Sequence, residues 1–217
     1  ATKNGLQIAS VASGLGWQFP MTTDDENTRR AGIEANKKAL QIAAWLGTDA
    51  LLWVPGGVGV DFIPNFARVS YDNAMQRTRA ALRELKPVAE SLGVTLAIEN
   101  VWNKFLLSPL EMRDLIDQQS STHIGVYFDC GNVLLTGYPE DWIRILGHRI
   151  ARVHLKDFKK SIGTLDGFCP LLQGDVDYAA VMKALRAANY NGALTAEYFS
   201  EDDLEPCSKA IDKILEM

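Results

Sequence analysis

The feature that most constrains the fold of this chain is a repeated alternation between short apolar runs and longer amphipathic stretches. Each run is rich in aliphatic and aromatic residues and is followed by a loop and then by apolar residues at helical spacing. Six such runs are found: Leu6–Ser13, Ala50–Pro55, Thr95–Asn100, Ile124–Asp129, Ala151–Asp157 and Ala193–Phe199. Because a chain that returns through a helix places its next strand parallel to the previous one, this order predicts an α/β fold with a parallel sheet.

The segments between the runs carry helix signals. Thr23 or Asp24 is expected to cap a helix that reaches Leu46. Apolar residues in the range 75–92 repeat at three and four positions, and Pro87 among them is expected to bend or break that helix. Further helices are expected after the capping box Ser108–Glu111, over Pro139–Leu146, from Tyr178 onward and over Leu204–Met217.

Six strand–helix units are two fewer than the eight of a closed (β/α) barrel, which has ~250 residues. With 217 residues, the chain is expected to form a single domain over residues 1–217, a TIM-type (β/α) barrel that lacks its first two βα units. The sequence does not begin with Met and opens almost directly in an apolar run, which favours N-terminal truncation. An open six-stranded α/β sheet is the alternative, because both folds have the same strand spacing.

Composition narrows the classes of function. The net charge of -5 argues against a nucleic-acid partner, because phosphate binding needs a basic face. The three cysteines form no CxxC pair, which argues against a disulfide framework and fits a reducing, cytoplasmic compartment. No apolar run approaches the ~20 residues of a membrane helix, so no membrane partner is expected.

Four potential metal ligands each close an apolar run at its carboxyl end: Glu99, Asp129, His154 and Glu197. Carboxyl ends of parallel strands meet at one rim, so the four side chains are expected to converge there. Three carboxylates and one imidazole favour Mn²⁺, Mg²⁺, Co²⁺ or Zn²⁺ over a metal that prefers thiolates. Taken singly, each acidic residue is more often a cap or a salt-bridge partner, so the prediction depends on the coincidence of all four.

Four neighbours are candidates for substrate binding: Lys156, Asn132, Trp17 and Trp102. Lys156 lies two residues after His154, so both side chains are expected on the same face of the strand. A salt bridge from Lys156 to one of the carboxylates is an equal alternative. Asn132 follows a strand end, where simple turn chemistry is the alternative. The two tryptophans are expected either to line a sugar pocket or to pack in the core.

At these residues the sequence resembles the xylose isomerase-like TIM-barrel superfamily, and within it the sugar phosphate isomerase/epimerase branch that includes ketose 3-epimerases. The matching pieces are LAIEN (96–100), FDCGN (128–132), RVHLKD (152–157), QGDVDY (173–178) and LTAEY (194–198). They span the last four strands, about half of the chain. The front half matches loosely, through the Pro55-Gly56 pair after a strand and a helix that leads into that strand.

The resemblance implies that Glu99, Asp129, His154 and Glu197 coordinate one divalent metal ion, with Glu99 and Glu197 as the catalytic acid/base pair. The implied reaction is proton transfer beside a ketone through a metal-stabilised enediolate, as in a sugar or sugar-phosphate epimerase or aldose–ketose isomerase. The sequence departs from the epimerases where Asn132 replaces a His and where Phe105-Leu106 occupies the region of a further Glu. Substrate contacts are therefore not carried over.

Two other classes of function are weighed against the isomerase. Apurinic endonucleases share the barrel and bind three zinc ions, but they need more histidines than this chain has, and His123 and His148 precede strands at the opposite end. A truncated barrel that binds metal without turnover is the second alternative, and its exposed strand edges would favour a homodimer. The expected partner of an active chain is a small-molecule sugar or sugar phosphate.

Overall fold

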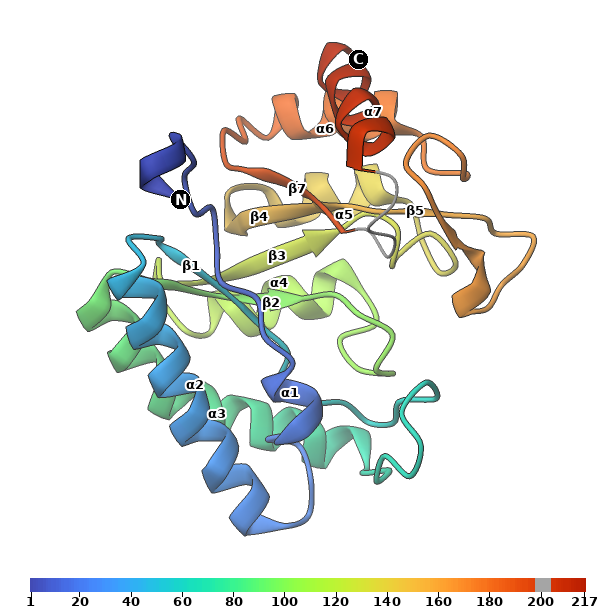
Figure 1. Ribbon diagram of the computed structural model, residues 1–217. Helices are drawn as coiled ribbons and strands as arrows, with labels where there is room; N and C mark the ends of the chain where they lie inside the picture. Colours follow the sequence, from blue (N-terminus) through green and yellow to red (C-terminus); the bar gives the residue numbers. More distant parts are fainter. Residues whose placement is uncertain (198–203) are drawn as a thin grey trace.

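The computed structural model describes residues 1–197 and 204–217, and its centre is a curled parallel sheet (Figure 1). The strand order is β1-β2-β3-β4-β7. The bounds are Ala50–Trp53 for β1, Thr95–Glu99 for β2, Ile124–Asp129 for β3, Ile150–Leu155 for β4 and Leu194–Ala196 for β7. Neighbouring strands pair in parallel, as the alternation of runs and helices predicts. The end of the last expected strand, Tyr198 and Phe199, lies outside the described residues.

The expectation of a full strand over Leu6–Ser13 is wrong. This segment makes one parallel bridge, between Val11 and Leu51 of β1. Just before the bridge, the guanidinium of Arg152 on β4 donates a hydrogen bond to the carbonyl oxygen of Ala9 at 2.9 Å. The segment therefore has partners on both β1 and β4, and its parallel pairing with β1 is limited to the bridge at Val11.

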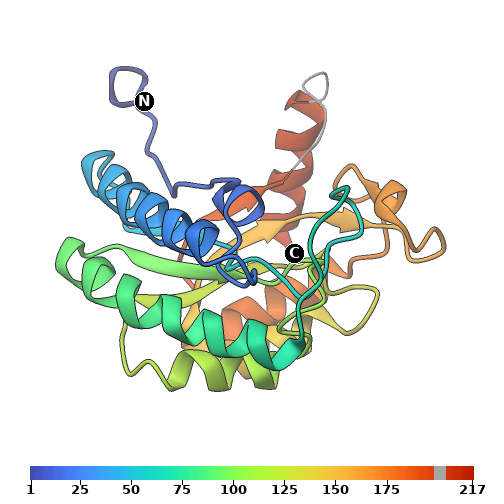
Figure 2. The ribbon, with the colours of Figure 1, turned by 90° about the horizontal axis from the view of Figure 1, so that it is seen from below.

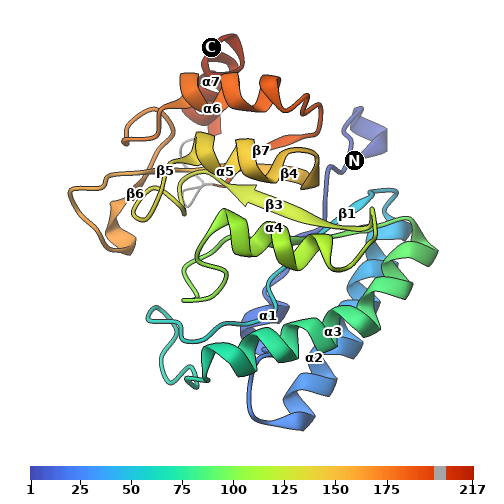
Figure 3. The ribbon, with the colours of Figure 1, turned by 180° about the vertical axis from the view of Figure 1, so that it is seen from behind.

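Helices cover the convex side of the sheet, where α2 packs against α3, α4 against α5, and α5 against α6. Figure 3 shows α4 and α5 in front of the sheet, and Figure 2 shows α2 beside α3. The bounds are Leu15–Gln18 for α1, Glu26–Trp45 for α2, Tyr71–Leu92 for α3, Pro109–Asp117 for α4, Pro139–Leu146 for α5, Tyr178–Ala187 for α6 and Leu204–Glu216 for α7. Short 3₁₀ helices span Thr2–Asn4, Gly147–Arg149 and Leu165–Gly167. The arrangement is a (β/α) half-barrel, and no described helix is long and apolar enough to cross a membrane.

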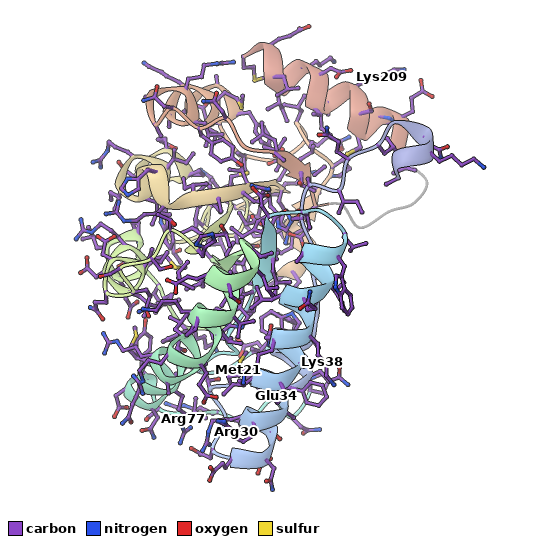
Figure 4. The ribbon with its side chains drawn as sticks, turned by 90° about the vertical axis from the view of Figure 1, so that its left-hand side faces the viewer. Met21, Arg30, Glu34, Lys38, Arg77 and Lys209 are labelled. Atoms are coloured by element: carbon purple, nitrogen blue, oxygen red, sulfur yellow. The ribbon has the colours of Figure 1, made fainter. Side chains whose placement is uncertain are left out.

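Helix α2 begins later than expected, because its N-cap is Asp25 and neither Thr23 nor Asp24. The Asp25 carboxylate accepts the backbone N–H of Thr28 at 2.9 Å, which satisfies one of the free donors of the first turn. Charged side chains four residues apart follow the solvent side of this helix, as Figure 4 shows: Arg30, Glu34 and Lys38. The opposite side of α2 packs into the core.

Pro87 lies inside α3, and the helix continues through it, so of the two expected outcomes the break does not occur. A proline in a helix interior removes a hydrogen bond and costs about 3 kcal/mol. Leu82, Leu85 and Ala89 on either side of it are fully buried. Burial of each leucine contributes about 1.5–3 kcal/mol, so the packing of α3 offsets the lost bond.

The two faces of the sheet bury different sets of side chains. On the concave face, a small apolar layer consists of Leu52, Val54, Ala97 and Tyr127. Because side chains alternate along a strand, residues two positions further on share that face. Glu99 lies two residues after Ala97, and Asp129 lies two residues after Tyr127. The apolar layer thus forms the floor beneath the polar strand ends.

The buried carboxylate of Asp157, just after β4, binds the turn that contains Gln173, Gly174 and Asp175. Asp157 begins β5 (Asp157–Phe158), which pairs antiparallel with β6 (Phe168–Cys169). Its carboxylate accepts the backbone N–H groups of Phe158 at 2.8 Å, Gly174 at 3.0 Å and Val176 at 3.2 Å. These three hydrogen bonds hold the segment that follows β6 against β5.

Gly174→Ala is expected to lower the free energy of unfolding by about 2 kcal/mol, in the range of overpacked sites. A Cβ at Gly174 would lie 2.1 Å from Asp157 Oδ1 and 2.7 Å from the backbone nitrogen of Phe158. Gly14→Ala is the matched control, because nothing lies within 4 Å of a Cβ there and its φ of -83° suits any residue. Urea denaturation of both variants checks this, and equal midpoints would contradict it.

Candidate metal centre

The structure brings Glu99, Asp129, His154 and Glu197 together at the carboxyl end of the sheet. Each residue offers one ligand atom, and these atoms all lie within 4.8 Å of one another. Glu99 ends β2, Asp129 ends β3, His154 is next to last in β4, and Glu197 directly follows β7. The four side chains therefore come from four neighbouring strands of one sheet and face one point.

Hydrogen bonds and ion pairs link the members of this cluster. His154 Nδ1 lies 3.0 Å from Glu99 Oε1 and 3.4 Å from Glu197 Oε2. The ring of Tyr127 packs on the His154 imidazole, with 4.3 Å between their centroids. Burial lowers the pKa of His154, but the hydrogen bond that its ring donates to Glu99 and the surrounding carboxylates outweigh it, so the net pKa is raised.

Asp129 is the most deeply buried of the four and carries an oxygen suited to a cation. Its Oδ1 accepts the backbone N–H of Asn132 at 2.8 Å. Its Oδ2 is buried and has no hydrogen-bond partner among the described residues. The nearest cationic nitrogens, Lys156 Nζ and His154 Nδ1, lie 3.7 and 3.9 Å away. Burial raises the pKa of Asp129 to about 8, so a metal-free site favours the protonated acid at neutral pH.

Lys156 supplies a fixed positive charge beside the cluster. Its Nζ lies 2.9 Å from Glu197 Oε2 and 4.3 Å from the centroid of the Phe168 ring. Burial opposes its charge, yet Asp129 and Glu197 raise the net pKa of Lys156, so it stays an ammonium. Burial also opposes the charge of Glu197, but Lys156 holds the pKa of Glu197 below its ordinary value. The alternative of a salt bridge is thus observed for Lys156.

A cavity of about 560 Å³ opens onto this cluster. It is lined by Glu99 and Glu197 together with all four candidate substrate-binding residues: Trp17, Trp102, Asn132 and Lys156. Trp17 packs edge-on against Phe62, with 5.6 Å between ring centroids, and Trp102 packs against Phe168 at 5.0 Å. The aromatic side chains therefore wall the cavity, while the carboxylates form its polar end. A volume of this size suits a small ligand such as a sugar.

Two asparagines, Asn100 and Asn132, hydrogen-bond the backbone at the ends of β2 and β3. The sequence had not indicated this positioning role for either residue. Asn100 Oδ1 accepts the backbone N–H of Asp129 at 2.9 Å, and Asn100 Nδ2 donates to the Asp129 carbonyl at 2.8 Å. Asn132 Nδ2 donates to the Asn100 carbonyl at 3.0 Å, and Trp102 Nε1 donates to the Asn132 carbonyl at 2.8 Å. The only sequence signal for Asn100 is its place directly after the strand-end glutamate.

The residues fit a divalent cation. Three carboxylates and an imidazole converge, and one buried carboxylate oxygen has no hydrogen bond among the described residues. Oxygen-rich sites of this kind bind hard or borderline divalent ions.

A family model described as xylose isomerase-like TIM barrel matches residues 1–217. The chain belongs to the xylose isomerase-like TIM-barrel family. This confirms the resemblance drawn from the strand-end motifs and the barrel class of the fold. SgbU of Escherichia coli strain K12, provisionally named as an L-ribulose-5-phosphate 3-epimerase, is 28% identical over 217 residues, which cover 96% of this chain and 72% of that protein.

Solved structures of the family share this fold. A D-tagatose 3-epimerase-like protein superimposes with a TM-score of 0.84 at 19% identity, covering 99% of this chain and 79% of the other. The IOLI protein, solved with a bound zinc atom, superimposes with a TM-score of 0.76 at 16% identity, covering 97% of this chain and 76% of the other. At these identities the likeness establishes the barrel fold alone.

Proposed function

We propose that this chain, acting as one domain over residues 1–217, is a divalent-metal-dependent isomerase or epimerase of a sugar or sugar phosphate. The observation that carries the proposal is the convergence of Glu99, Asp129, His154 and Glu197 within 4.8 Å beside the cavity of about 560 Å³. The relative named as an L-ribulose-5-phosphate 3-epimerase and the zinc-containing neighbour support it. The predicted partner is a small-molecule sugar.

In this proposal the four strand-end residues hold one divalent ion, and Mn²⁺ suits their mixture of carboxylates and imidazole best. When bound, the ion supplies electrostatic stabilisation to a substrate oxygen that becomes negatively charged as a neighbouring carbon loses its proton. Asn100 and Tyr127 position the ligands, Asn100 through the Asp129 backbone and Tyr127 through the His154 ring. Trp17 and Trp102 keep water away from the reacting carbon.

Glu99 and Glu197 are proposed to move the proton. Glu99 ends β2 and Glu197 follows β7, two strands that are separated by two others in the sheet, and both residues line the cavity. In the proposal their carboxylates face the bound sugar from opposite sides. One carboxylate removes the proton from the carbon beside the ketone, and the other donates a proton to the opposite face, which gives the epimer. Return of the proton to the adjacent carbon gives aldose–ketose isomerisation. Lys156 keeps Glu197 ionised and oriented for this transfer.

The test is deuterium exchange from solvent, followed by proton NMR. The full chain, loaded with Mn²⁺ and verified by metal analysis, is incubated in D₂O with L-ribulose, D-fructose, D-tagatose, L-ribulose 5-phosphate and a 3-keto-glucoside. Exchange at the carbon beside the carbonyl in at least one sugar, abolished by a chelator, is expected. A chain that holds one metal ion but exchanges no proton in any of these sugars would be the inert barrel, and the proposal would be wrong.

A further inference from the structure

A second cavity adjoins the one at the metal centre. It encloses about 620 Å³ and shares five lining residues with the first: Phe62, Val101, Trp102, Asn132 and Leu165. Trp102 is fixed between the two cavities, because its Nε1 donates to the Asn132 carbonyl and its ring packs on Phe168. A ligand seated at the metal centre can therefore extend past Trp102 into the second cavity.

The second cavity has an apolar wall that the proposed chemistry does not use. Three of its leucines are exposed although they are large and apolar: Leu107 at 61%, Leu135 at 40% and Leu165 at 45% of their surface. They come from the loops after β2, β3 and β5, so three separate segments place apolar side chains around one hollow. Exposed apolar side chains gathered at one cavity mark a ligand or partner site.

The charges around the two cavities disfavour a phosphate. The cations among the described lining residues are Lys104 and Lys156, and each is paired with a carboxylate. Lys104 Nζ lies 2.6 Å from Asp61 Oδ1, and Lys156 Nζ lies 2.9 Å from Glu197 Oε2. Asp166 adds a further negative charge to the second cavity. A phosphate dianion placed there would lose hydration against apolar walls and meet two aspartates.

We propose that the second cavity binds an uncharged apolar substituent of the substrate, so that the sugar is an aryl or alkyl keto-glycoside and carries no phosphate. The inference rests on the proposed function only for placing the sugar carbonyl at the metal centre. A ring ketone keeps the substituent on its anomeric carbon, and the cavity beyond Trp102 gives that substituent an apolar environment. An open-chain ketose has no such group and leaves this cavity to water.

Calorimetric titration of the Mn²⁺-loaded full chain tests the inference through binding affinity, a readout that does not depend on turnover. The probes are 4-nitrophenyl and methyl 3-keto-β-D-glucopyranoside, and L-ribulose with and without its 5-phosphate. Burial of an aromatic ring is expected to make the nitrophenyl glycoside bind at least about tenfold more tightly than the methyl glycoside. The phosphate is expected to improve the affinity for L-ribulose by less than about threefold, since no unpaired cation meets it among the described lining residues.

Variants of exposed leucines test whether the preference for the nitrophenyl glycoside arises in the second cavity. Leu135→Asp and Leu107→Asn alter the cavity wall at exposed positions and are expected to remove most of the nitrophenyl preference. Leu110→Asp is the matched control, because Leu110 is 49% exposed and lines neither cavity. A preference that survives both wall variants, or a phosphate that improves binding more than about tenfold, would overturn the inference. Proton exchange in free ketoses without a nitrophenyl preference would refute this inference alone, whereas the preference without exchange in any sugar would refute the proposed function alone.

Discussion

Replacement of Glu197 by Gln is expected to lower kcat for epimerisation by about 10³-fold, within the range for loss of a general acid or base. The amide has nearly the shape of the carboxylate but cannot take or return a proton at neutral pH. Its oxygen can still face the cation, so the variant should bind one metal ion with reduced affinity. Lys156 loses the charge of its nearest partner but keeps Asp129 at 3.7 Å, so the fold is expected to survive.

The sharpest readout is the exchange pattern of the two epimers. If Glu99 and Glu197 serve opposite faces, Glu197→Gln should still exchange the proton of the one epimer that Glu99 reaches, while interconversion is lost. Glu99→Gln should show the reverse pattern. Glu34→Gln, on the exposed face of α2, is the control and should change neither rate. Activity within tenfold of the parent chain, measured with metal bound, would contradict the assignment of Glu197 as an acid/base.

The convergence of Glu99, Asp129, His154 and Glu197 was predictable from sequence because its geometry follows from a local signal. A ligand at the carboxyl end of an apolar run is visible in the chain, and a parallel sheet brings such ends together without further information. The same reasoning placed Lys156 on the face of His154, and the two side chains share the Glu197 carboxylate. Five of the six expected runs form strands of the main sheet. They were predictable for the same reason, because the apolar character of each run can be read from the local sequence.

The features that sequence reasoning missed depend on contacts between distant segments. Leu6–Ser13 makes one bridge to β1, and its Ala9 carbonyl accepts a hydrogen bond from Arg152, more than a hundred residues away in sequence. The continuity of α3 through Pro87 depends on how well its leucines pack, which no local pattern reports. The leucines of the second cavity come from three loops whose conformations follow from tertiary packing, so no spacing rule could bring Leu107, Leu135 and Leu165 together.

The affinity for Mn²⁺ is expected to rise about tenfold per pH unit between pH 6 and 8 and then to level off. Burial raises the pKa of Asp129 to about 8, so below that pH the metal-free site holds a proton that must leave before the carboxylate can bind the ion. The raised pKa of His154 acts in the same direction, because an imidazolium cannot be a ligand. Isothermal titration across this range checks the slope, and an affinity that is flat from pH 6 to 8 would contradict the site.

The difference in stability between the chain with the ion and the chain without it should widen as pH rises. The unfolded chain releases the Asp129 proton near its ordinary pKa of 3.8, whereas the folded metal-free chain holds it to about pH 8. Metal-free protein is therefore expected to lose stability as pH rises from about 4 to about 8, because the folded state binds more protons over that window. Bound metal adds about 2.7 kcal/mol at a concentration of 100 Kd, or roughly 5–10 °C in Tm for a chain of this size. The gap between the melting temperatures with Mn²⁺ and with a chelator should consequently widen with pH, and Asp129→Asn should remove both the gap and its pH dependence.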